Sequence, residues 1–92
     1  QIIQAAAERG VRSVITSTLE SGIGVVAALH LAAASPAVRL ECGLATLHLL
    51  VDDLVMNNLS VRDGLLTVPT GPGLGIALDG EALHRYSFRG FD

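Results

Sequence analysis

The sequence has no lysine and no tryptophan, and among its 92 residues only one is cysteine and three are aromatic. A single cysteine excludes a disulfide framework and a cysteine-rich zinc site. It also fits a reducing compartment, so a cytoplasmic location is expected. Because aromatic side chains are so few, a hydrophobic core has to be built from leucine, valine, isoleucine and alanine.

The charged residues are sparse and mixed in sign. Six arginines are scattered singly among nine carboxylates, for a formal net charge of −3, so no basic stripe exists for a nucleic acid to follow. Half of the chain is hydrophobic and 16% is charged, which excludes a disordered tail. The longest apolar run, at 23–34, is shorter than the roughly 18 residues that a membrane span needs. We therefore expect neither a nucleic-acid nor a membrane partner.

The order of the elements is typical of a parallel α/β unit. Periodicity and turn signals predict a helix at 1–8, a strand at 11–18, a helix at 22–34, a strand at 39–45 and a helix at 47–56. Such alternation of helix and strand is the pattern of that class. Further along, Asp63-Gly64 predicts a hairpin and 81–85 a helical turn. The glycine-rich stretch at 71–75 lacks the G-x-G-x-x-G spacing and predicts a structural turn.

Two parallel strands do not make a stable sheet, because both would have an unpaired edge. The helix at 22–34 is apolar nearly all round and needs more cover than two strands provide. The first residues also resemble the middle of a helix, without a capping residue before them. These features together predict a fragment of a larger α/β domain.

Hydroxyl groups gather at the predicted carboxyl end of the first strand. Thr16, Ser17 and Thr18 lie just before a helix N-terminus, where hydroxyls and N–H groups suit a carboxylate or a phosphate. The alternative is that they only cap the helix. Strand alternation would put Thr16 and Thr18 on one face and Ser17 on the other. Gly43 ends the second strand, where it either lets a ligand approach the backbone or forms a bend.

Other polar residues have structural interpretations. Glu20 could act as a general acid or base. The favoured interpretation is that its carboxylate complements the positive end of the helix. Cys42 is interpreted as core packing, and His30 as a hydrogen-bonded core residue. Asp52 and Asp53 would point about 100° apart on a helix, which predicts a solvated face rather than a metal site.

Three stretches together carry a family resemblance. They are VITSTLESGIG at 14–24, ECGLATL at 41–47 and VRDGLLTVPTGPGLGIALD at 61–79. This set resembles the C-terminal part of the enolase superfamily, in its muconate cycloisomerase subgroup. Within that subgroup it is most similar to the o-succinylbenzoate synthases.

The resemblance implies an α/β fold, the C-terminal part of a (β/α)7β TIM-like barrel with an α+β capping domain. Residues 1–56 would form the seventh and eighth barrel strands with their helices. Residues 57–92 would return across the barrel and pack on it and on the capping domain. The remainder of the barrel would then be the partner of this chain.

The resemblance also implies a reaction. Synthases of this kind are Mg2+-dependent lyases of menaquinone or phylloquinone synthesis that remove a proton α to a carboxylate and then lose hydroxide. Their lysines and metal carboxylates lie on the second to sixth strands, and this sequence has no lysine. The chain would therefore supply no catalytic residue and no Mg2+ ligand. It would supply positions that bind a small carboxylate substrate, namely Thr16, Ser17, Thr18 and Gly43.

Other functions stay open. Cycloisomerases and dipeptide epimerases carry an acidic residue two positions after the eighth-strand glycine, where this sequence has Ala45. That departure disfavours both. It leaves an N-acylamino acid racemase, or another enzyme of the subgroup, as the alternative. A stand-alone, non-enzymatic binding module is the second alternative.

Overall fold

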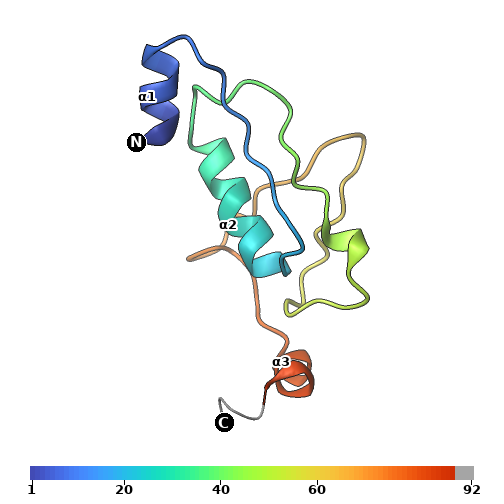
Figure 1. Cartoon of the computed structure of the whole chain (residues 1–92). Coiled ribbons are helices and arrows are strands. Elements are labelled where there is room, and N and C mark those ends of the chain that lie inside the picture. The colour runs from blue at the N-terminus through green and yellow to red at the C-terminus, as the bar shows by residue number, and fades with distance from the viewer. Residues whose placement is uncertain (89–92) are drawn as a thin grey trace.

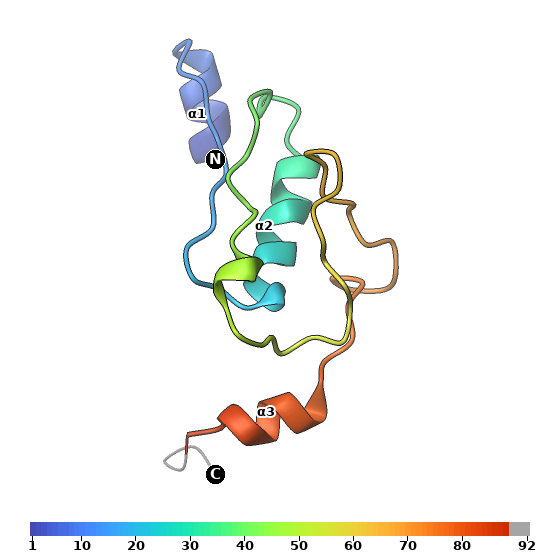
Figure 2. The same cartoon turned by 90° about the vertical axis from the view of Figure 1, so that its right-hand side faces the viewer.

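The computed structural model describes residues 1–88 (Figure 1). Within them lie the helices α1 (Ile2–Glu8), α2 (Gly22–Ala33) and α3 (Gly80–Tyr86) and the short 3-10 helix η1 (Leu47–Leu49). Long extended segments connect these elements, and α1 and α3 lie at opposite ends of the molecule (Figure 2). No helix within residues 1–88 has the length and apolar content needed to cross a membrane.

Helix α2 is the centre of packing. Its Val25 and Leu29 form a buried cluster with Leu44. Half-buried apolar side chains from both halves of the chain pack against this cluster, among them Ile15, Cys42, Leu47, Leu66 and Val68. The helix is thus covered by the segments before and after it, and Cys42 packs in the core as the sequence predicts.

The two predicted strands meet at a single parallel bridge between Thr16 and Gly43. The Gly43 N–H donates to the carbonyl of Ile15, and the Ser17 N–H donates to the carbonyl of Gly43, both at 2.9 Å. Regular strands over 11–18 and 39–45 are not formed, so the prediction of their length is wrong. Two parallel segments with open edges have few backbone hydrogen-bond partners, and this explains why the pairing stays so short.

The predicted helix at 47–56 is wrong beyond its first turn, since only η1 is helical there. Two aspartates take over the backbone donors that a helix would use. The Asp53 N–H donates to Asp52 Oδ1 at 2.9 Å, and the Leu54 N–H donates to Asp53 Oδ1 at 2.7 Å. Such local side-chain bonds compete with the helix. Val55 instead forms an antiparallel bridge with Leu78.

Local turn and helix signals are confirmed. Asp63 and Gly64 have φ values of 52° and 75°, as a two-residue hairpin turn of type I′ requires. Arg62 and Leu65 pair across this turn with backbone hydrogen bonds of 2.9 and 2.8 Å. The predicted turn at 81–85 is the body of α3, which begins where the Asp79 carboxylate accepts two N–H groups.

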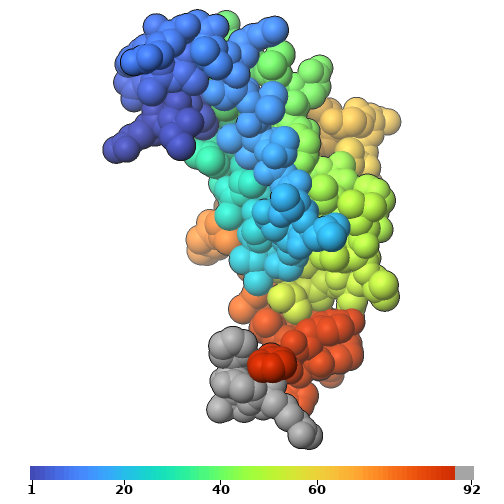
Figure 3. Space-filling model, in the orientation of Figure 1, coloured from blue at the N-terminus to red at the C-terminus, as the bar shows by residue number. Residues whose placement is uncertain are grey.

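The chain exposes more surface than a compact monomer of its size. Its accessible area is 7036 Å², whereas a folded protein of this mass exposes about 5,000 Å². Its radius of gyration is 15.1 Å, against about 12 Å for a compact chain of this length. Large apolar side chains lie on this surface, including Ile2 at 86% and Val51 at 105% exposure. Figure 3 shows the elongated outline that results.

The isolated 92-residue chain is therefore expected to behave as a loosely packed state. Its core is too small to offset chain entropy, and exposed apolar surface should bind the dye ANS. We expect ANS fluorescence together with broad, non-cooperative thermal unfolding in near-UV circular dichroism. A sharp two-state transition without dye binding would contradict this expectation.

Candidate functional site

The Thr16–Gly43 bridge separates two faces. Ile15 precedes Thr16 and Cys42 precedes Gly43 in the chain. Both side chains are half-buried and pack towards α2. Thr16, Thr18 and Gly43 are exposed, as the predicted alternation requires. The face that bears them points away from the helix. It lies at the carboxyl ends of two parallel segments, which is where ligands bind in α/β folds.

Gly43 allows the two segments to approach closely. A β-carbon built at Gly43 would lie 3.1 Å from Thr16 Cγ2, closer than such atoms normally pack. The exposed face therefore has backbone at Gly43 beside the side chain of Thr16. A larger residue at Gly43 would crowd Thr16 and fill the space in front of it.

The other two hydroxyls of the predicted set have protein partners. Ser17 Oγ lies 2.7 Å from Thr46 Oγ1 and donates to the carbonyl of Gly43 at 3.2 Å. Ser17 thus joins the two segment ends from the half-buried side. The Thr18 hydroxyl donates to Glu20 Oε1 at 3.3 Å. The structure thus places Thr16, Ser17 and Gly43 together and directs Thr18 towards the turn.

Two carboxylates already occupy the positive end of α2. Ser21, at the N-cap position, makes no side-chain cap bond. The Gly22 N–H donates instead to Asp53 Oδ1 at 2.7 Å. Glu20 Oε2 lies beside the first turn, 2.9 Å from where a β-carbon of Gly24 would be. A carboxylate at a helix N-terminus stabilises by about 0.3–1 kcal/mol. The Gly22 N–H is therefore not available to a ligand.

Asp52 and Asp53 do not form a solvated helical face, so that prediction is wrong. Asp53 is half-buried and contacts α2, while Asp52 holds α3. Asp52 Oδ2 accepts from Arg85 Nη2 at 2.7 Å and from the Tyr86 hydroxyl at 3.1 Å. The Asp53 N–H, followed by Arg85 and Tyr86, lowers the pKa of the Asp52 carboxyl. No local pattern predicts these contacts, because each partner is more than 30 residues away in sequence.

His30 and the glycine-rich stretch are structural, as predicted. His30 Nε2 lies 2.9 Å from the carbonyl of Leu74 and joins α2 to that stretch. Gly73 and Gly75 have φ values of 62° and 75°, which glycine adopts without strain. The Gly75 N–H donates to the carbonyl of Pro72 at 3.0 Å, which closes a turn rather than a phosphate-binding loop.

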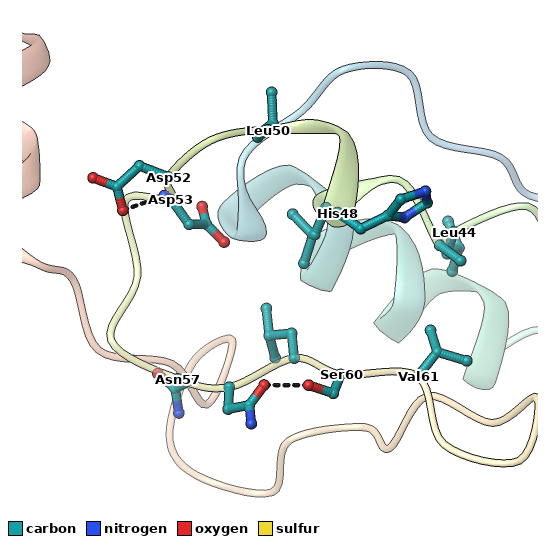
Figure 4. A pocket seen from close by; sticks show the side chains of 12 residues that line it. Leu44, His48, Leu50, Asp52, Asp53, Asn57, Ser60 and Val61 are labelled. Carbon is teal, nitrogen blue, oxygen red and sulfur yellow. Dashed lines mark hydrogen bonds between the residues drawn. The ribbon is translucent and has the colours of Figure 1, made fainter.

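A pocket of about 550 Å³ lies beyond the end of the second segment (Figure 4). Leu44 and Val61 lie at one end of it, and Asp52, Asp53 and Asn57 at the other. Thr16 and Gly43 do not line it, but Leu44 and Ala45, which follow Gly43, do, so the pocket adjoins the exposed Thr16–Gly43 face. No sequence motif predicts this pocket, because 44–50 and 57–61 face each other only once the chain between them turns back.

Residues 1–88 do not bring together three His, Cys, Asp or Glu side chains that could hold a metal ion. The two adjacent carboxylates, Asp52 and Asp53, have Arg85 and Gly22 as partners. The Mg2+ ion that the family resemblance implies therefore does not fit a ligand set within the described part of the chain.

Comparison with known proteins decides the family. Residues 1–83 match the family described as "Enolase C-terminal domain-like". The chain belongs to this family. Its relatives place it in the muconate cycloisomerase subgroup of the enolase superfamily, which confirms the resemblance.

The relatives include enzymes of two activities. A chloromuconate cycloisomerase of Pseudomonas putida is 36% identical over 81 residues, which are 88% of this chain and 22% of that protein. An o-succinylbenzoate synthase of Thermobifida fusca (strain YX) is 39% identical over 66 residues, 72% of this chain and 21% of that protein. The chain thus spans about a fifth of the length of these relatives.

The fold is similar to part of a solved enzyme. The muconate lactonizing enzyme from Klebsiella pneumoniae superposes with a TM-score of 0.79 and 35% sequence identity. The match covers 94% of this chain and 24% of that structure. Nearly all of the chain therefore follows the fold of part of that enzyme, although residues 1–88 pair only at isolated bridges and form no regular strand.

Replacing Arg85 by alanine should raise the pKa of Asp52 towards its ordinary value of 3.8. A lowered pKa means that the folded form favours the ionised carboxylate. The stabilising contribution of this group is thus present above pH 3.8 and is lost as the pH falls through the lowered value. An NMR titration of the Asp52 carboxyl carbon in the complete protein measures the change. Arg62→Ala, in the exposed hairpin, is the control, and an unchanged Asp52 titration in Arg85→Ala would contradict the assignment.

Proposed function

We propose that this chain is the C-terminal part of the barrel of a muconate cycloisomerase-subgroup enzyme and that the segment ends bearing Thr16, Ser17, Thr18 and Gly43 form its binding site for a carboxylate substrate. The observation that supports this most is the parallel Thr16–Gly43 bridge, whose exposed face lies at the carboxyl ends of two neighbouring segments. In α/β barrels that end carries the active site. Within the set, Thr16 and Gly43 would face the substrate, while Ser17 holds the two segment ends together.

The rest of the same barrel is the partner that we propose. Residues 1–56 would supply the seventh and eighth strands with their helices, and 57–92 would return to the capping domain. The large accessible surface supports this, since the exposed apolar side chains need cover that residues 1–88 do not provide. The base and the carboxylates for Mg2+ would belong to that remainder, because this chain has no lysine and its described residues form no metal site.

For the reaction we propose dehydration to o-succinylbenzoate, as in a lyase of menaquinone or phylloquinone synthesis. A base outside this chain would remove the proton α to the carboxylate, the electron pair would form the new double bond, and hydroxide would leave. Ala45 supports this choice, since it lies exposed two residues after Gly43 and carries no charge. The relatives named above include a synthase of this kind.

Cycloisomerization of a muconate or chloromuconate is the second candidate function. It is supported by the relatives, since five chloromuconate cycloisomerases match at 33–38% identity. The racemase alternative has no observation of its own in its favour. A non-enzymatic module has less support than either, because the relatives are metabolic enzymes.

Assays of the complete protein that contains this chain distinguish these reactions. With Mg2+ present, we expect dehydration to o-succinylbenzoate to proceed, with little turnover of muconate or chloromuconate. Efficient turnover of the muconates with no dehydration would reject the synthase proposal and favour the second candidate. Failure of every carboxylate substrate would reject the binding role of the Thr16–Gly43 face.

Gly43→Val should weaken substrate binding in the same protein. Its side chain would crowd Thr16 and project into the exposed face, so KM should rise about tenfold, equivalent to about 1.4 kcal/mol. Steady-state kinetics measures this, and Mg2+ affinity should be unaffected. Cys42→Ser is the control, because that side chain packs towards α2 and should leave catalysis intact. Unchanged kinetics in Gly43→Val would remove Gly43 from the site.

A further inference from the structure

The N-terminus of α2 is held by a carboxylate from a distant part of the chain. Asp53 Oδ1 accepts from the Gly22 N–H and from the Leu54 N–H, each at 2.7 Å. One oxygen thus joins the first residue of α2 to the segment that follows η1. Asp53 is half-buried and takes the place of a side-chain cap from Ser21, which makes none.

The segment that carries Asp53 and Val55 lies very close to the backbone of Gly22. Gly22 is buried, and a β-carbon there would lie 2.6 Å from Val55 Cγ2 and 2.7 Å from Asp53 Oδ2. Any other residue in place of Gly22 would push the segment that carries Asp53 and Val55 away from α2. Glycine at this position is therefore a requirement of the contact with Asp53 and Val55, not only of the helix start.

The backbone that follows Asp53 is fixed by pairing with another segment of the chain. The next residues pair with the segment before α3, through the Met56 N–H to the Ala77 carbonyl and the Asp79 N–H to the Leu54 carbonyl, both at 2.8 Å. Val55, between them, is only 7% exposed. The carboxylate is thus attached to a paired and buried segment rather than to a free loop.

A short turn connects this anchored point to the candidate binding face. Gly22 follows Thr16 by six residues, and the turn between them is closed by a bond from the Glu20 N–H to the Thr18 carbonyl at 2.9 Å. The position of Gly22 therefore limits where Thr16 and Thr18 lie. Displacement of reacting or binding groups by 1 Å can cost about 100-fold in rate.

We infer that Asp53 is a positioning residue: its bond to the Gly22 N–H fixes the start of α2 and thereby the hydroxyl-bearing turn at 16–22. This inference rests on the proposed function of that turn in substrate binding. The Glu20 carboxylate lies at the same helix end, so a negative charge remains there when the charge of Asp53 is removed. The acceptor oxygen and its location are what matter.

Three variants of the complete protein separate these contributions. Asp53→Ala removes the acceptor, whereas Asp53→Asn keeps an oxygen of the same reach and removes the charge. Asp52→Asn is the matched control, since the amide keeps an Oδ1 acceptor for the Asp53 N–H and the other partners of Asp52 are Arg85 and Tyr86, not α2. Two measurements are made on each variant: hydrogen–deuterium exchange of peptides covering 16–24, and steady-state KM and kcat with the substrate that the unaltered protein turns over.

In Asp53→Ala we expect exchange in 16–24 to accelerate at least tenfold and kcat/KM to fall about tenfold or more, mainly through KM. Asp53→Asn should restore both values to near those of the unaltered protein, and Asp52→Asn should change neither. Unchanged exchange in Asp53→Ala would overturn the inference. So would faster exchange with unaltered KM and kcat, because Asp53 would then stabilise the helix without positioning the site.

Both of those outcomes leave the proposed function standing, since the unaltered protein is active in them. If the unaltered protein turns over none of the carboxylate substrates, the proposed function fails instead, and the positioning role fails with it. The two failures are therefore distinguished by the activity of the unaltered protein.

Discussion

The arrangement of the chain depends on burying the apolar side chains of α2. This helix carries no charged side chain, and its Val25 and Val26 are fully buried. Each such burial stabilises by about 1.5–3 kcal/mol, so the chain wraps around the helix from both sides. Leu44 packs against it in the buried cluster, and Ile15 and Leu66 pack against that cluster. The place of the Thr16–Gly43 bridge follows from this, because the residues beside it are the ones that cover the helix.

The same arrangement explains why the outer surface is so large. Residues that cover α2 with one face leave the opposite face of the Thr16–Gly43 pair exposed, and two parallel segments leave their outer edges unpaired. A closed barrel removes such edges and places this opposite face in its interior. The polar groups on that face, Thr16 and the backbone of Gly43, would then meet a ligand rather than bulk water. The family membership and the exposed area thus point to the same interpretation.

Features that depend on neighbouring residues could be predicted from the sequence. Helix α2 follows from a long apolar run ended before Pro36, and the hairpin follows from Asp63-Gly64, since both signals are local. Features that depend on distant partners could not. The apolar pattern at 47–56 fits a helix, but the Asp52 and Asp53 carboxylates take its N–H groups. The role of Asp53 at the start of α2 requires a partner 31 residues away, and no spacing rule reveals it.

We propose that these residues complete a larger barrel and supply substrate-binding positions to it. The first measurement to make is the mass of the intact protein as it occurs in its source, by mass spectrometry after mild purification. We expect a mass several times 9.5 kDa, because the base, the metal carboxylates and the cover for the exposed apolar surface would then belong to the same polypeptide. A mass near 9.5 kDa would contradict it, since a chain without lysine would then have to fold and act alone.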